Sequence, residues 1–248
     1  MIRYHFVIAP LGYDLKHFNY FLNPEKGDWD WSKYVLNAHP ELKRLKKGNK
    51  FGKSNIRKYL IKFREDNHNI LESKKEEFEK FFNAKSDVLL KNLLNLLQLK
   101  ETKINEIMIL ISTCPINPRN IKKKEFSVYY NFPSEDMFAI AMHEILHFVY
   151  FEKWEEVFPE SNEESFDGPH IIWHLSEIVA PILLNSNELQ NVLKYNHRGY
   201  SEYDKLKFGN RDIGDIIKDF YKESNNFEDF LKKAYKFVLE NKEKIQSI

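Results

Sequence analysis

The sequence predicts an α+β fold in which helices dominate and a small β-sheet precedes the helix that carries the main functional motif. Three observations support this class. Residues 2–8 place Ile2, Tyr4, Phe6 and Ile8 on one side, as in a half-buried strand. From about residue 13 to residue 100, apolar residues recur at spacings of three and four, which is the period of amphipathic helices. Two β-branched or aromatic runs, at 107–111 and 126–130, come directly before the motif helix.

Further elements follow from the same patterns. We expect the run at 126–130 to form an edge strand beside a cleft, where an extended peptide could add through backbone hydrogen bonds. Helices are expected near 134–152, 169–185, 212–223 and 226–241. We divide the chain into residues 1–103, an N-terminal strand with a helical region, and residues 104–248, a metal-binding region. The two are expected to form one compact unit.

Composition limits the class of protein. With 42% hydrophobic and 15% aromatic residues among 248, the chain can bury a substantial core. Its 38 Lys and Arg nearly balance its 37 Asp and Glu, so no global field draws it toward nucleic acid or an anionic membrane. The single cysteine, Cys114, suits a reducing compartment and a structural thiol. No run approaches the about 18 apolar residues of a membrane helix, so a cytoplasmic protein without a membrane partner is expected.

One segment of the N-terminal region is basic and contains a false phosphate loop. Residues 48–54 resemble that loop, but three residues rather than four separate Gly48 from Gly52, and no buried strand precedes them. Nucleotide hydrolysis is therefore not expected. Ten cations lie between residues 43 and 64, and acids follow closely after them. We interpret the segment as a solvated face whose charge is balanced locally, so nucleic acid is not the expected partner.

The clearest motif is His143-Glu144-Ile145-Leu146-His147. Ser134 and the two acids after it indicate a helix start, so the motif lies in the middle of a helix. Two histidines four positions apart stack on one helix face with Cβ atoms about 5–6 Å apart. They can therefore reach one zinc ion at about 2.0–2.1 Å. Glu144 stands beside that face, where it can take a proton from metal-activated water.

A catalytic zinc site needs a third protein ligand. Asp167-Gly168-Pro169 indicates another helix start, and His170, His174 and Glu177 then share one face of the helix that follows. Each of these three side chains can point toward the motif helix. Weaker candidates lie in the preceding loop: Glu163, Glu164 and Asp167.

At these residues the chain resembles the gluzincins, a superfamily of zinc metallopeptidases. The matching residues are His143, Glu144, His147 and Glu177, and the resemblance covers roughly residues 105–185. It implies a zincin-like fold and one zinc ion held by the two histidines and Glu177. It also implies that Glu144 acts as the base and that the substrate is a peptide or protein.

Three functions compete. The first is a zinc peptidase, for which a donor to the developing oxyanion would be sought in His197-Arg198-Gly199-Tyr200, although structural roles for these residue types are more common. The second is a regulatory or binding protein that keeps the scaffold without catalysis and acts through its basic helical half. The third is a metal-dependent hydrolase of a non-peptide amide, because the metal chemistry is shared.

Overall fold

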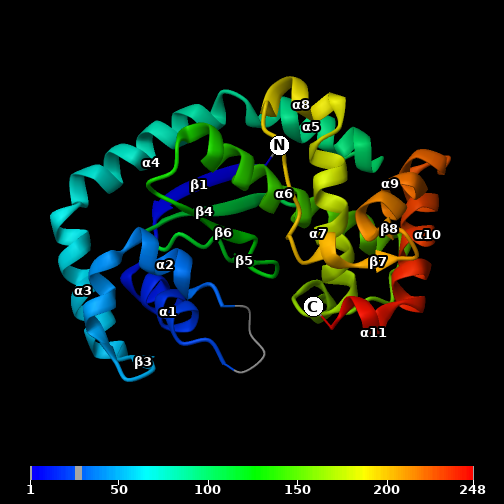
Figure 1. Cartoon of the computed structure of the whole chain (residues 1–248). Helices are drawn as coiled ribbons and strands as arrows, with labels where there is room; N and C mark the ends of the chain where they lie inside the picture. The colour runs from blue at the N-terminus through cyan, green and yellow to red at the C-terminus, as the bar shows by residue number, and fades with distance from the viewer. Residues whose placement is uncertain (1, 26–29, 248) are drawn as a thin grey trace.

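The computed structural model describes residues 2–25 and 30–247 and contains a four-stranded mixed sheet near its centre (Figure 1). The sheet order is β1-β4-β6-β5, with β1, β4 and β6 parallel and β5 antiparallel at the edge. In the register, Phe6 lies opposite Ile109, and Ile109 lies opposite Phe126. The bounds are β1 (Arg3–Ile8), β4 (Glu106–Ser112), β5 (Arg119–Asn120) and β6 (Glu125–Tyr129).

Helices make up most of the remaining described chain. The bounds in the N-terminal region are α1 (Leu11–Leu22), α2 (Ser32–Ala38), α3 (Lys53–Asp66), α4 (His68–Asn83) and α5 (Ser86–Leu97). Those in the C-terminal region are α6 (Ser134–Val157), α7 (Ile171–Leu184), α8 (Asn187–Leu193), α9 (Ile213–Glu223), α10 (Phe227–Glu240) and α11 (Lys242–Ile245). Two short hairpins connect helices. The first consists of β2 (Lys46–Lys47) and β3 (Lys50–Phe51), and the second of β7 (Lys207–Phe208) and β8 (Arg211–Asp212). The predicted mixture of helix and sheet is confirmed.

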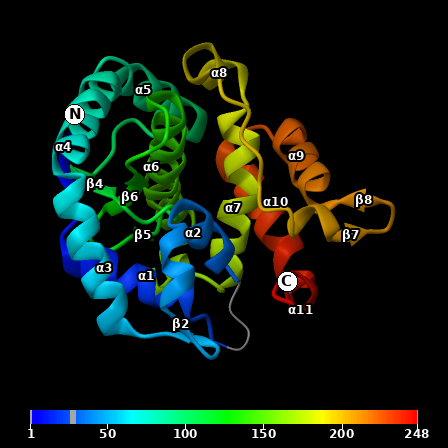
Figure 2. The same cartoon turned by 60° about the vertical axis from the view of Figure 1, so that its left-hand side comes forward.

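The long helix α6 connects the sheet to the C-terminal helices. It packs against β6 and against α4 and α5, and it also contacts α7. Figure 2 shows α7, α9 and α10 gathered on the side of α6 that faces away from α3 and α4. Because α6 is covered from several directions, it is buried on most of its circumference, including Phe148, Val149 and Trp154. The motif helix therefore lies at the junction of the two halves of the fold.

Two hydrophobic clusters stabilise this arrangement. The main core takes side chains from both predicted regions, residues 1–103 and 104–248. A smaller cluster lies among α1, α2 and α3 and includes Cys114, which is fully buried. Burial raises the pKa of the Cys114 thiol to about 12, so the thiol is unreactive at neutral pH, as expected of a structural cysteine.

A buried polar cluster ties the N-terminal helices to the end of β4. The carboxylate of Asp14 accepts hydrogen bonds from Ser112 Oγ at 2.7 Å and Thr113 Oγ1 at 2.8 Å. Arg64 completes the cluster with an ion pair of 2.7 Å to the same carboxylate. Because every member has a partner, the cluster anchors α1 and α3 beside the sheet without leaving an isolated charge.

Two predictions about local structure are wrong, namely the edge strand at 126–130 and the cap at Ser134. The run at 126–130 is not an edge strand, because β5 pairs with β6 on the side opposite β4. Helix α6 does begin at Ser134, as predicted, but the Ser134 side chain does not cap it, because its hydroxyl donates to Glu77 Oε1 at 2.6 Å. The false phosphate loop forms the turn between β2 and β3, with Gly48 at a φ of 58°, and the start of α3.

The expected local balance of the basic segment is also largely absent. Asp66 pairs with Lys62, but Glu72 and Glu77 pair with lysines of their own helix, α4. Eight exposed cations make no ion pair with any residue that the structure describes: Lys43, Arg44, Lys46, Lys47, Lys50, Lys53, Arg57 and Lys58.

Among the described helices, none is both long and apolar enough to cross a membrane.

Candidate metal centre

Helix α6 presents the two histidines of the motif on one face. Their Nε2 atoms lie 3.0 Å apart, and the rings meet edge to face. His147 is fully buried, whereas the side chain of His143 keeps 24% of its surface exposed. Solvent therefore reaches the site at His143 but not at His147.

Helix α7 brings Glu177 against this pair. Glu177 Oε2 lies 3.4 Å from His143 Nε2, and Glu177 Oε1 lies 3.4 Å from His147 Nε2. The ligand atoms of the three residues all lie within 4.8 Å of one another, so they could hold a metal ion. Of the candidates for the third ligand, the structure thus brings Glu177 to the two histidines.

The protonation states of His147 and Glu177 suit a metal ion. Burial, reinforced by the charge of Arg119, lowers the pKa of His147 to about 3, so its imidazole is neutral and keeps a free lone pair. Burial alone would raise the pKa of Glu177, but the Arg119 guanidinium holds it well below its usual range. His147 Nδ1 is buried without a hydrogen-bond partner in the described chain. A neutral imidazole and an ionised carboxylate are the forms that bind metals.

Glu144 lies beside the three potential ligands and does not belong to their group. Its side chain is 8% exposed, and Arg119 Nη1 donates to Glu144 Oε2 at 3.2 Å. Burial raises the pKa of Glu144, and the Arg119 charge opposes that shift. With His143, Glu144 lines a cavity of about 370 Å³. The carboxylate can thus exchange protons with a molecule held in that cavity.

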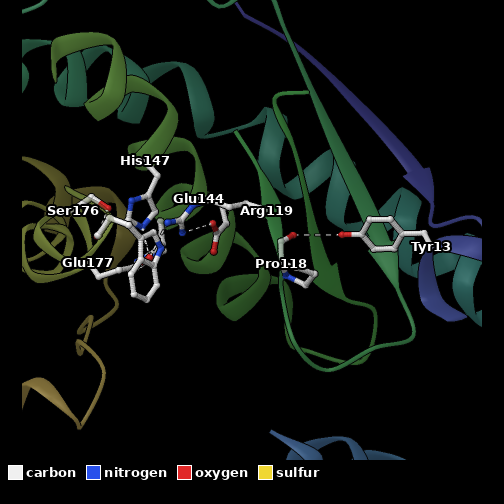
Figure 3. Close-up of polar contacts among 9 residues, drawn as sticks. Tyr13, Pro118, Arg119, Glu144, His147, Ser176 and Glu177 are labelled. Carbon is white, nitrogen blue, oxygen red and sulfur yellow. Dashed lines mark hydrogen bonds and ion pairs between the residues drawn. The ribbon is translucent and has the colours of Figure 1, made fainter. Parts of the chain in front are cut away.

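Arg119 is the site residue that sequence analysis missed. It stands on β5, and its Nη2 donates to Glu177 Oε1 at 2.8 Å while its Nη1 contacts Glu144 (Figure 3). The neighbouring Pro118 carbonyl accepts a hydrogen bond of 3.4 Å from Tyr13 on α1, so the N-terminal half supports this segment (Figure 3). No motif surrounds Arg119 in the sequence. The only available signal was a polar residue close to a predicted strand.

The rival ligands are placed elsewhere. His170 caps α7, where its Nδ1 accepts a hydrogen bond of 3.2 Å from Ile172 N. His174 Nδ1 contacts Tyr203 Oη at 3.0 Å, and burial lowers the pKa of His174 to about 4. Within the described residues, the ligand group includes none of the other candidates, Glu163, Glu164 and Asp167.

The segment considered for an oxyanion donor forms the opposite wall of the cavity. The ring of His197 lies nearly parallel to that of His143, with centroids 6.3 Å apart. Asn185 fixes the backbone of His197 from both sides, accepting from its N–H at 2.9 Å and donating to its carbonyl at 2.7 Å. Arg198 lines the same cavity and is exposed. Burial lowers the pKa of His197 to about 3, so its ring is neutral and carries one N–H donor.

Comparison with family models, with curated proteins and with solved structures returned no match to this chain. The function proposed below therefore depends on the chemistry of the site alone.

Proposed function

We propose that this protein binds one zinc ion through His143, His147 and Glu177 and hydrolyses peptide bonds, with Glu144 as the general base. The observation that carries the proposal is the convergence of two helices on one point. Three ligand atoms meet there, and a carboxylate outside the ligand group lies beside them on an open cavity. Three protein ligands with one free position are the usual composition of a catalytic zinc site.

The separations between the ligand atoms support zinc. A tetrahedral ion with ligands at about 2.0–2.1 Å has neighbouring ligands about 3.3–3.4 Å apart. The two Nε2 atoms here are 3.0 Å apart, and each lies 3.4 Å from a different oxygen of Glu177, His143 from Oε2 and His147 from Oε1. Two imidazole nitrogens and one carboxylate form a common set of catalytic zinc ligands. This is also the set that the resemblance to gluzincins implies.

Each side chain then has a defined part in the reaction. A zinc ion at this position would lower the pKa of a bound water molecule to about 7 and polarise the scissile carbonyl. Glu144 accepts the proton of the attacking water and passes it to the leaving amine. Arg119 holds Glu144 in position from β5. His197, neutral and across the cavity, is our candidate donor to the negative charge that develops on the carbonyl oxygen.

A non-catalytic binding role through the basic helical half is the second candidate. The observation that favours it is the set of eight exposed cations between residues 43 and 58 that have no ion-pair partner in the described chain. Salt-dependent binding of a polyanion by a protein without peptidase activity would support this alternative.

Replacing Glu144 with Gln separates the two candidates. The amide keeps the size of the side chain but cannot take a proton, and Glu144 lies outside the ligand group, so zinc content and fold should persist. Cleavage of a peptide library should fall by about 10² to 10⁴, the usual contribution of general-base catalysis. Elemental analysis controls for equal zinc content. Equal cleavage by wild type and variant would refute the role of Glu144.

A further inference from the structure

The cavity beside Glu144 has two walls of different origin. One wall is formed by His143 and Glu144 of the motif helix, and the other by residues 195–198, which follow α8. Its volume of about 370 Å³ lies at the lower end of the range for ligand pockets, about 300–1,000 Å³. A molecule that occupied this cavity would contact both the proposed base and the 195–198 segment.

The second wall carries a cation on a well-fixed backbone. Asn185 makes two hydrogen bonds to the backbone of His197, and the ring of His197 lies against His143. Arg198 follows directly, lines the cavity and is exposed. It makes no ion pair with any residue in the described part of the chain. Its guanidinium therefore has no counter-charge among the residues that the structure describes.

The two carboxylates of the site share one guanidinium. Glu144 and Glu177 both contact Arg119, at 3.2 Å and 2.8 Å. These two carboxylates and the guanidiniums of Arg119 and Arg198 sum to zero charge. The divalent ion of the proposed function would then leave the site with a charge of +2, so a substrate with a negative group is favoured electrostatically.

We propose that this cavity binds a carboxylate of the peptide substrate and that Arg198 recognises it. The carboxylate belongs either to an acidic side chain next to the scissile bond or to the C-terminus of the peptide. A guanidinium suits this role because its donors match the two oxygens of a carboxylate. The inference rests on the proposed function and adds a substrate class, namely acidic peptides or peptides with a nearby free C-terminus.

Binding to a variant that cannot complete the reaction tests the inference. We would use zinc-loaded Glu144→Gln protein and three labelled peptides of one sequence. The first has an internal Glu and an amidated end, the second has Gln and a free C-terminus, and the third has Gln and an amidated end. The Kd values should be about 10- to 150-fold lower for the first or the second peptide than for the third, because a hydrogen bond to a charged group contributes about 1.5–3 kcal/mol. Which of the two binds tightly identifies the source of the carboxylate.

A second substitution in the same background assigns the effect to Arg198. Arg198→Gln should abolish the preference for a carboxylate. Lys194→Gln, the same charge change at an exposed residue outside the cavity, should preserve it. Equal Kd values for all three peptides, no detectable binding, or a preference that survives Arg198→Gln would overturn the inference.

The failure of the proposed function would look different. A wild-type protein without zinc, or one whose cleavage does not depend on Glu144, would refute the function and this inference with it. A zinc-loaded peptidase that ignores the carboxylate would refute the inference alone.

Discussion

Arg119→Met is the substitution with the most specific expected consequence. Met keeps an unbranched apolar side chain in place of the arginine but removes the guanidinium. In the metal-free protein, Glu144 and Glu177 then lose the cation that both contact. Removing one partner of a buried ion pair is strongly destabilising, because an uncompensated charge remains in a poorly solvated position.

The burial of the three side chains sets the magnitude. Arg119 is 11% exposed, Glu144 8% and Glu177 1%, so the weak energies of surface pairs do not apply. We expect a loss of about 3–5 kcal/mol in the free energy of unfolding. A chain of 248 residues has an unfolding entropy of about 0.5 kcal/mol/K, at about 2.1 cal/mol/K per residue. The melting temperature should therefore fall by about 6–10 °C.

Thermal unfolding followed by circular dichroism, with a chelator and then with zinc, provides the assay. Zinc would supply positive charge at Glu177, so the loss caused by Arg119→Met should be smaller in the zinc-loaded protein. Arg3→Met serves as a control, because Arg3 pairs with Glu106 while both side chains are more than half exposed. Breaking that pair should cost about 1 kcal/mol or less.

Two results would refute this reasoning. A loss no larger than that of Arg3→Met would mean that the Arg119 pairs contribute little. An equal loss with and without zinc would mean that the guanidinium and the metal do not act on the same carboxylate.

Two further predictions concern the ligands and one neighbouring histidine. His147→Ala should remove zinc from the purified protein, and Glu177→Ala should weaken zinc binding more than His174→Ala in a competition with a chelator, because His174 contacts Tyr203 instead of the ligand group. The reverse order would transfer the ligand role to His174. Because the pKa of His174 is lowered from 6.5 to about 4, the unfolded chain takes up its proton first as the pH falls. The stability that His174 contributes is therefore present above pH 6.5 and is lost between about pH 6.5 and 4. His174→Gln should flatten the dependence of urea-unfolding free energy on pH across this window, and an unchanged slope would contradict the prediction.

The parts of the site that lie on single helices could be predicted from the sequence. The spacing of His143 and His147 determines their common face, and the helix start near residue 170 makes Glu177 a candidate in the same way. Choosing between His174 and Glu177 was harder. Residues three positions apart on a helix differ in direction by about 60°, so a modest rotation of α7 decides which of them meets α6.

The parts that depend on strand pairing could not be predicted. Arg119 reaches Glu144 and Glu177 because residues 117–120 return alongside β6, with Ser127 N donating to the Pro118 carbonyl at 3.1 Å. A two-residue strand has too short a pattern to be detected. The same pairing converts the run at 126–130 from a predicted edge strand into an interior one.

The energetics of the site favour a ligand-binding role over a stabilising one. Two carboxylates, a guanidinium and the fully buried imidazole of His147 lie at the junction of α6, α7 and β5. Apolar side chains of similar volume would stabilise such a position as well or better, because buried ion pairs recover little more than their desolvation cost. The fold nevertheless places one of these groups, Glu144, on an open cavity, and His147 Nδ1 is left without a partner in the described chain. Unusual charge and protonation gathered at a cavity are expected where a protein binds a ligand or catalyses a reaction. A dication bound at the two Nε2 atoms would offset the cost of this cluster, since it would add positive charge beside Glu177 and accept the lone pairs of both imidazoles.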